Sequence, residues 1–256
     1  MYTVDDLRNI MARLRGENGC PWDRVQTHES LKRNMIEECY EAIEALDNHD
    51  DKMFSNELGD CLLQIVFHAR LAEERGAFNF DDVVNEICTK LISRHTHIFG
   101  EAKADNAEEA LAEWEKQKKS EKGLKSFTDA LKDVPKNFPA LIRAEKIQKK
   151  AAKAGFDWND ISGAEEKLYE EISELKEALK SANQDEINEE YGDLLFAAVN
   201  VGRFANADPE LSLTAATNKF ISRFEKMEKL ANEKGKKLDE MNLEEMDSLW
   251  NEVKKK

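Results

Sequence analysis

The residues best suited to chemistry are two groups of carboxylates with the same spacing. Each group has a Glu-Glu-x-x-Glu run followed by Glu-x-x-Asp. The first group is Glu37, Glu38, Glu41, Glu57 and Asp60, and the second is Glu170, Glu171, Glu174, Glu190 and Asp193. Every member of the second group lies 133 residues after its counterpart, which indicates a duplicated unit with a first and a second copy. Carboxylates that converge from two helices offer the oxygen ligands that Mg²⁺ prefers.

Helical spacing places some of these acids on or beside the apolar faces of their own helices. Around Glu190, apolar residues recur at helical spacing and form a stripe that includes Glu190 itself, while Glu171 and Glu174 flank the stripe of the preceding helix. Burying an unpaired carboxylate costs several kcal/mol, so a buried group needs a cation. We therefore interpret both groups as Mg²⁺ ligands. The alternative for any single glutamate is a solvated helix face. A di-iron site is disfavoured, since no histidine has a glutamate three residues before it.

Cationic residues follow each acidic group in the same order. A Lys-x-x-x-Arg pair and then a Trp-x-x-x-Lys pair occur in both copies, as Lys90, Arg94, Trp114 and Lys118, and as Lys219, Arg223, Trp250 and Lys254. Lysine and arginine four residues apart share a helix face, and an arginine can grip phosphate oxygens in pairs. Lys167, one turn before Glu171, is a further candidate, with Asn34 in its place in the first copy. The sequence thus predicts a polyphosphate site, with surface solubility or intrahelical ion pairs as the alternative.

Helices must position all of these side chains. Only four prolines and eleven glycines interrupt the 256 residues, and apolar residues recur mostly at helical spacing. Helices are expected near 3–16, 28–48, 51–76, 80–98, 106–120, 138–154, 163–182, 185–206, 209–233 and 242–254. The fold predicted is all-α, with domains at 1–122 and 140–256. The segment 123–139, which contains Pro135 and Pro139, is interpreted as a linker.

Composition and missing motifs exclude several classes of protein. A net charge of −15 argues against a nucleic acid partner, and no apolar run of about 18 residues suggests a membrane span. The first residues lack the features of a secretory signal. Four cysteines without a Cys-x-x-Cys pair indicate reduced, mostly buried thiols in a cytoplasmic protein. Phosphate-binding loops of the P-loop and Rossmann types and the Gly-x-Ser-x-Gly elbow are also missing.

Taken together, these motifs resemble the MazG family of nucleoside triphosphate pyrophosphohydrolases. The run Gly19-Cys20-Pro21-Trp22-Asp23 with Gln26-Thr27-His28 is also similar to that family's N-terminal signature. The resemblance covers nearly the whole chain, as a tandem protein with two MazG domains. It implies an all-α homodimer in which helices of both subunits complete four-helix-bundle-like sites. It also implies Mg²⁺-dependent hydrolysis of ribo- and deoxyribonucleoside triphosphates to the monophosphate and pyrophosphate, which removes aberrant nucleotides or tunes nucleotide pools under stress.

The resemblance gives the residues of the second copy specific roles. Glu171, Glu174, Glu190 and Asp193 would hold the metal and carry catalysis, with Glu170 at the edge of the set. Lys219 and Arg223 would stabilise the leaving pyrophosphate, and Trp250 and Lys254 would add contacts to the substrate. Because Asn34 replaces a lysine, we expect the first copy to serve dimerisation, regulation or a weaker activity. Two alternatives stay open, namely a non-enzymatic helical interaction module and an all-α pyrophosphatase specific for dUTP or dCTP.

Overall fold

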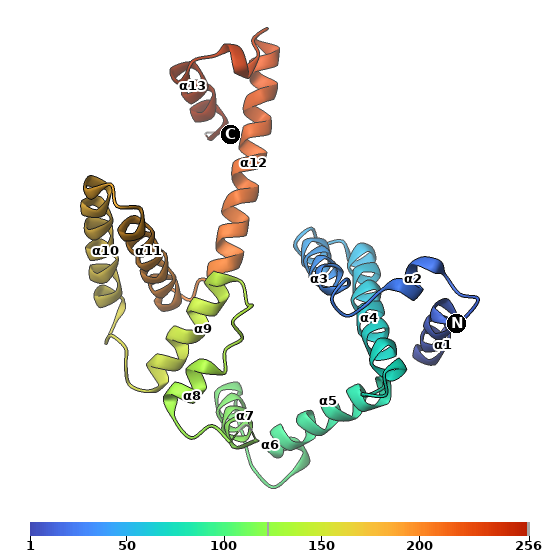
Figure 1. The fold of residues 1–256 in the computed structure, drawn as a ribbon. Coiled ribbons are helices and arrows are strands. Elements are labelled where there is room, and N and C mark those ends of the chain that lie inside the picture. Colours follow the sequence, from blue (N-terminus) through green and yellow to red (C-terminus); the bar gives the residue numbers. More distant parts are fainter. Residues whose placement is uncertain (122, 255–256) are drawn as a thin grey trace. The chain divides into compact units, whose positions relative to one another are not determined.

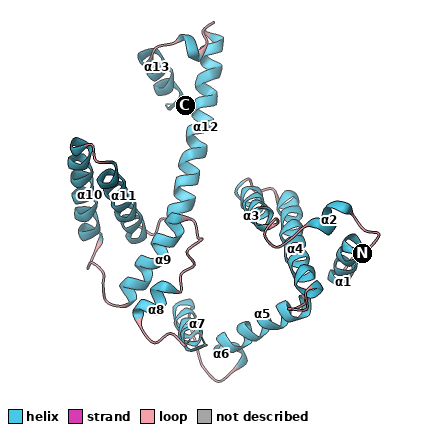
Figure 2. Ribbon diagram, in the orientation of Figure 1, coloured by secondary structure: helices cyan, strands magenta, loops and turns pink. Residues whose placement is uncertain are grey.

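The computed structural model describes residues 1–121 and 123–254, and every regular element within them is a helix (Figures 1 and 2). The all-α prediction is therefore confirmed. The chain divides into two compact units, Met1–Lys122 and Gly123–Lys256. The segment 123–139, which we interpreted as a linker, belongs to the second unit and contains a short helix, α8 (Phe127–Lys132).

Each unit is built around one long helical hairpin. The helices of the first unit are α1 (Val4–Arg15), α2 (Pro21–Val25), α3 (Lys32–Asp47), α4 (Asp51–Glu74), α5 (Phe80–Arg94), α6 (Thr96–Phe99) and α7 (Ala107–Glu121). Those of the second unit after α8 are α9 (Ala140–Lys153), α10 (Ile161–Ser181), α11 (Gln184–Phe204), α12 (Pro209–Glu233), the short 3₁₀ helix η1 (Leu238–Glu240) and α13 (Leu243–Lys254). The hairpins are α3–α4 and α10–α11.

The turn of each hairpin has the same backbone form. His49 and Ala182 occupy equivalent positions and both adopt a left-handed conformation with a φ of 55°. The next helix then begins with a side-chain cap, because Asp50 accepts a hydrogen bond from the Met53 N–H and Asn183 accepts one from Asp185. This shared turn brings the two acidic segments of each copy side by side.

The buried core of the first unit joins its first helix to the hairpin. Met11 of α1, Leu31 before α3, and Val66, Phe67 and Leu71 of α4 form one cluster. Burial of such side chains contributes roughly 1.5–3 kcal/mol each, so this cluster holds α1 against α4.

The second unit has its largest buried cluster away from the hairpin. Met227 and Ala231 of α12 pack against Leu249 and Val253 of α13. Helix α12 begins beside α9 and α11 and continues beyond them, and α13 folds back along its far end (Figure 1). The hairpin α10–α11 itself is covered mainly by α9.

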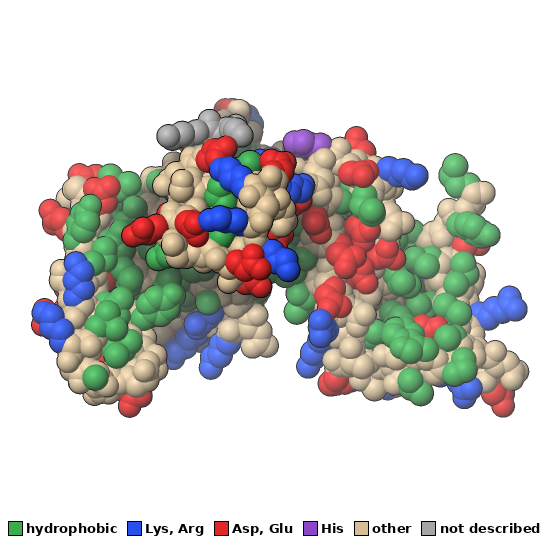
Figure 3. Space-filling model, turned by 90° about the horizontal axis from the view of Figure 1, so that it is seen from above, with side chains coloured by type: hydrophobic (Ala, Val, Ile, Leu, Met, Phe, Trp, Pro, Cys, Tyr) green, Lys and Arg blue, Asp and Glu red, His purple; other side chains and the backbone are tan. Residues whose placement is uncertain are grey.

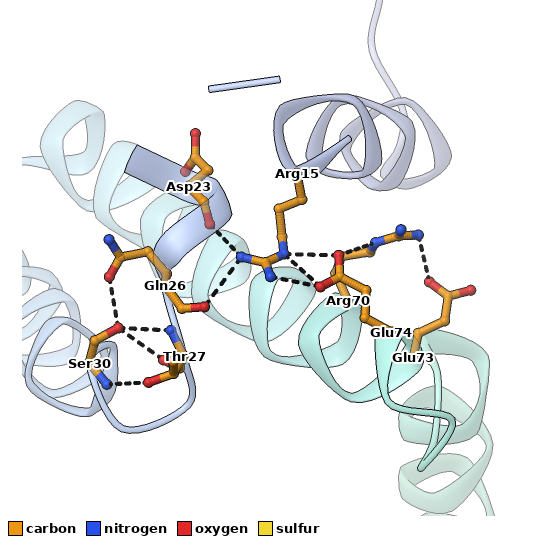
Figure 4. A network of polar contacts seen from close by, with 8 residues as sticks. All are labelled: Arg15, Asp23, Gln26, Thr27, Ser30, Arg70, Glu73 and Glu74. Atoms are coloured by element: carbon orange, nitrogen blue, oxygen red, sulfur yellow. Dashed lines mark hydrogen bonds and ion pairs between the residues drawn. The ribbon is translucent and has the colours of Figure 1, made fainter. Parts of the chain in front are cut away.

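One arginine, Arg15, anchors the segment between Asp23 and Gln26 of the first unit (Figure 4). Arg15 at the end of α1 forms an ion pair with Glu74 of α4, with an N–O distance of 2.7 Å, and donates to the carbonyl groups of Asp23 and Gln26. In the second unit Arg203 of α11 reaches Asp157 instead, through two hydrogen bonds. In each unit, the segment that precedes the hairpin is thereby tied to the second helix of that hairpin.

Some local features differ from the sequence prediction. The short helices α2 and α8 were not predicted, and the helix expected at 80–98 is interrupted at His95, whose ψ of 54° is not helical. The four cysteines are free, but the expectation that most are buried was wrong, because Cys39 and Cys88 are exposed and Cys20 and Cys61 are half-buried.

Candidate functional site

Three carboxylates of the second copy converge between α10 and α11. Glu171, Glu174 and Glu190, hereafter the second cluster, each place one oxygen within 4.8 Å of the others. Glu171 is only 4% exposed, Glu190 is half-buried, and Glu174 is open to solvent. The cluster therefore has a buried floor and an accessible mouth.

Lys167 compensates part of this charge. Its ammonium lies 2.7 Å from Oε1 of Glu171 and 2.8 Å from Oε1 of Glu170. The other oxygen of Glu171, Oε2, is buried and has no hydrogen-bond partner in the described part of the chain. The two carboxylates raise the pKa of Lys167, so it stays charged. Glu170 is exposed and pairs with Lys167 on the outer side, outside the cluster of three.

Electrostatic repulsion is evident within the second cluster. The pKa of Glu190 is raised, chiefly by burial and then by the neighbouring charges of Glu174, Glu171 and Asp193. Asp193 is exposed and acts on the cluster through its charge, although it is not one of the three converging residues. A cation between these groups would relieve the repulsion.

An open hollow lies beside the second cluster. It has a volume of about 560 Å³ and its walls come from α10 and α11. Five of the side chains that line it are glutamates, namely Glu170, Glu174, Glu177, Glu186 and Glu190. Such a lining favours cations, and it leaves space at the mouth of the cluster for a larger group bound through them.

The first copy holds an equivalent cluster between α3 and α4. Glu38, Glu41 and Glu57, hereafter the first cluster, again have oxygens within 4.8 Å of one another. Glu57 is buried, and the pKa of Glu38 is raised by burial and by the nearby charges of Asp60 and Glu41. Glu37, like Glu170, points away from the cluster, and it pairs with Arg33 on the helix surface.

Neutral amides take the place of Lys167 in the first cluster. Gln64 donates from Nε2 to Glu38 over 3.4 Å, and Asn56 lies 3.3 Å from both Glu57 and Asp60. Sequence reasoning missed both amides as site residues. The sequence signal for Gln64 is its position, because the second copy has the apolar-stripe residue Ala197 at the equivalent place.

Another polar pair replaces apolar residues beside the first cluster. His28 and His68 lie with their Nδ1 atoms 2.8 Å apart, where the second copy has Ile161 and Val201. Their rings are nearly parallel with centroids 5.1 Å apart, which is the N–N distance plus two ring radii. The rings thus lie end to end and share one N–H···N hydrogen bond.

The cationic residues of the first copy are engaged within their own unit. Arg94 of α5 forms an ion pair with Glu121 of α7 at 2.7 Å, and Lys90 lies 3.5 Å from Glu86. Arg94 and Lys118 also lie near the ring of Trp114, at 5.5 and 4.7 Å from its centroid. Helices α5 and α7 therefore form a local cation–aromatic cluster.

The equivalent residues of the second copy are less engaged. Trp250 of α13 packs against Phe220 of α12, with Lys254 at 5.8 Å from the Trp250 centroid. Among the residues the structure describes, neither Lys219 nor Arg223 forms an ion pair, and Lys219 is exposed. Within the described residues, no hydrogen bond or ion pair joins these cations to the second cluster.

The donor set of both clusters fits a hard divalent cation. All six side chains are carboxylates, and oxygens within 4.8 Å are close to the roughly 3–4 Å separations around an ion with bonds of about 2.1 Å. The buried, unpartnered Oε2 of Glu171 is the strongest indication, because leaving a carboxylate oxygen buried without a partner is costly. Nitrogen or sulfur ligands, which softer metals prefer, are not part of either cluster.

Comparison with known proteins supports the duplicated pattern. The model of the MazG nucleotide pyrophosphohydrolase domain matches twice, at residues 26–99 and 162–231, and these matches contain both hairpins. The chain is 48% identical over 250 residues to a Thermotoga maritima protein named nucleoside triphosphate pyrophosphohydrolase/pyrophosphatase MazG, covering 98% of this chain and 95% of that protein. It is 42% identical over 258 residues to the nucleoside triphosphate pyrophosphohydrolase of Escherichia coli K12, covering 100% and 98%.

A further relative carries the same region within a longer protein. The uncharacterized protein YabN of Bacillus subtilis is 48% identical over 254 residues, which is 99% of this chain but 52% of that protein. The two matches to the domain model and the full-length relatives lead to one conclusion. The chain belongs to the MazG nucleotide pyrophosphohydrolase family and contains two MazG domains in tandem.

Proposed function

We propose that this chain hydrolyses nucleoside triphosphates to the monophosphate and pyrophosphate, with Mg²⁺ held by Glu171, Glu174 and Glu190 and assisted by Asp193. The observation that carries the proposal is the buried Oε2 of Glu171 at the floor of a three-carboxylate cluster in a MazG domain. The relatives named above as nucleoside triphosphate pyrophosphohydrolases support the reaction type. The first cluster offers a second metal site of the same kind.

The residues of the second copy have separate roles in the proposed hydrolysis. When bound, Mg²⁺ supplies positive charge to the phosphate oxygens and lowers the pKa of water. The carboxylates orient the attacking water and accept its proton. Lys219 and Arg223 neutralise the charge that develops on the departing pyrophosphate, and Lys167, Trp250 and Lys254 add contacts to the substrate. In the first copy Lys90, Arg94 and Lys118 would have the corresponding positions, with ion pairs that must first be exchanged.

A homodimer is part of the proposal. In the described part of the chain, Lys219 and Arg223 form no ion pair with the second cluster, so a second copy is the natural source of cations facing it. Figure 3 shows hydrophobic side chains open at the surface. The exposed apolar residues of the second unit include Tyr191, Leu195 and Phe196 on α11 and Phe220 and Ile221 on α12. Covering them in a helical bundle would bury several large side chains.

Broad base specificity and a cytoplasmic location complete the proposal. The hollow beside the second cluster has a carboxylate lining and shows no enclosed pocket for one base. No helix in the described part of the chain has the length and apolar character that a membrane span requires. The net charge of −15 makes a nucleic acid polymer an unfavourable partner.

A panel of eight nucleoside triphosphates tests the function. Each is incubated with the protein and Mg²⁺ or with EDTA, and pyrophosphate and monophosphate are quantified. We expect turnover of most of the panel with Mg²⁺ and none with EDTA. Turnover of dUTP or dCTP alone would indicate a base-specific pyrophosphatase. No turnover at all, with metal present, would reject the enzymatic function in favour of an interaction module.

A further inference from the structure

Lys167 pairs with the same carboxylate on which the proposed metal site depends, through the other oxygen. Its ammonium takes one oxygen of the buried Glu171 at 2.7 Å and is held on the other side by Glu170 at 2.8 Å. A positive charge at this position stabilises the empty cluster. It also weakens the attraction of the free Oε2 for a divalent ion, since the two cations share the single negative charge of one carboxylate and repel each other.

Among the described residues, no lysine or arginine pairs with the first cluster. Asn34 stands in place of Lys167, and the hydrogen-bond donors are the neutral amides of Gln64 and Asn56. Amides align the carboxylates without cancelling their charge. Two clusters with the same three acids therefore differ in the charge that a divalent ion encounters.

We propose that Lys167 is a positioning residue that keeps the second cluster poor in metal until a triphosphate arrives. The first cluster then binds a divalent ion in the absence of nucleotide, whereas the second binds it tightly only together with the substrate. This inference rests on the proposed function, because it assigns the order in which metal and nucleotide reach that same site.

The geometry gives Lys167 a route between its two roles. Its side chain is 37% exposed, and Glu170 is 57% exposed, so both can move without disturbing the core. Glu171, at 6%, cannot follow. When phosphate oxygens approach, the ammonium leaves Glu171 and turns to the substrate, and the freed carboxylate receives the metal. Glu170 acts in this scheme as the resting partner of Lys167 rather than as a metal ligand.

Binding of Mn²⁺ to the full-length protein tests the proposal. Free Mn²⁺ is followed by electron paramagnetic resonance, with the first cluster silenced by Glu38→Gln and Glu57→Gln. Lys167→Asn, which installs the residue of the first copy, is expected to tighten Mn²⁺ binding at the second cluster by roughly tenfold without nucleotide. Lys167→Arg keeps the charge and is expected to change little. Lys229→Asn, which removes an exposed lysine paired with Glu225 on α12, is the matched control.

A bound nucleotide should remove the difference in Mn²⁺ affinity between the wild type and Lys167→Asn. In the presence of a triphosphate with a methylene group between its α and β phosphorus atoms, wild-type binding of Mn²⁺ is expected to tighten more than that of Lys167→Asn. The reciprocal variant Asn34→Lys, with Glu171→Gln and Glu190→Gln silencing the second cluster, is expected to weaken Mn²⁺ binding at the first cluster by roughly tenfold.

Unchanged Mn²⁺ affinity in Lys167→Asn overturns the inference. If a silenced background loses its helical circular dichroism, the same comparison is made as a two-site titration in the otherwise unaltered protein. Pyrophosphate release by the wild type is measured in parallel. Release together with unchanged affinity rejects only the role of Lys167, whereas neither release nor Mn²⁺ binding rejects the proposed function itself.

Discussion

The two acidic hairpins share their carboxylates and differ in nearly everything around them. The second cluster is compensated by an ammonium group and surrounded by further acids, with Glu189 where the first copy has Asn56. In the first cluster, amide groups contact the carboxylates. The neighbouring positions between the helices are Gln64, His68 and His28 rather than apolar residues. After duplication, the ligand positions kept their residue types while the residues that tune them changed.

The cationic helices show the same divergence. Arg94 is committed to Glu121 and Trp114 within the first unit, whereas Arg223 has no ion pair in the described part of the second unit. A phosphate-binding arginine must exchange any existing partner, and this exchange weakens binding. The difference favours the second copy as the main site of hydrolysis.

The strongest test of this comparison removes the equivalent acid from each cluster. Glu171→Ala is expected to lower the rate of pyrophosphate release with Mg²⁺ by about 10²–10³-fold, because it removes the carboxylate at the floor of the cluster. Glu38→Ala is expected to leave most of the rate. The rates are measured at saturating nucleoside triphosphate. An equal loss in both variants would contradict the ranking of the two copies.

A smaller effect is expected from the arginines. Arg223→Ala should reduce kcat/KM by about tenfold, because a charge-assisted contact to the leaving group is lost. Arg94→Ala should lower the melting temperature, since it breaks the pair with Glu121, while changing kcat/KM little. Steady-state kinetics and thermal melts of both variants separate these effects. A large kinetic loss in Arg94→Ala alone would reverse the assignment.

The histidine pair of the first copy predicts a modest pH dependence of stability. Burial, and then His28, lower the pKa of His68 from its ordinary value of 6.5. The unfolded chain therefore takes up a proton at a higher pH than the folded protein does. Stability is complete above pH 6.5 and falls as the pH drops towards the lower folded-state pKa.

His68→Val installs the residue of the second copy and tests this dependence. The fall in melting temperature between pH 7.5 and pH 5.5 is expected to be smaller in the variant than in the wild type. His49→Asn is the control, because asparagine tolerates the left-handed conformation of that turn. The same fall in His68→Val and the wild type would show that the pair does not govern it.

Sequence periodicity predicted the long helices well because each carries an apolar stripe, and α4 and α11 also begin with a side-chain cap. Asp50 and Asn183 begin their helices as expected for such caps. The short helices α2 and α8 lie where proline and glycine dominate the signal, so local propensity alone did not predict them. The break at His95 depends on backbone geometry that no residue type there demands.

The acids of the candidate site were accessible to sequence reasoning, but their surroundings were not. Duplication identified Glu171 and Glu190, and helical phase placed them near the apolar stripe. The depth of Glu171, at 4% exposed, depends on how α10 packs against α11. Asn56 and Gln64 were not predicted as site residues because amides on a helix are usually solvated. Asn56 contacts Glu57 within α4, whereas Gln64 reaches Glu38 only across the folded hairpin.

The anchoring of Arg15 has a consequence for dissecting the protein. The first match to the domain model starts at residue 26 and therefore omits α1, yet Arg15 and Met11 of that helix hold Glu74 and the Phe67 cluster. A fragment trimmed to the region of family similarity would leave Glu74 with Arg70 alone as its ion-pair partner and would uncover apolar surface. The region that matches the domain model is therefore shorter than the region whose side chains pack together in the first unit.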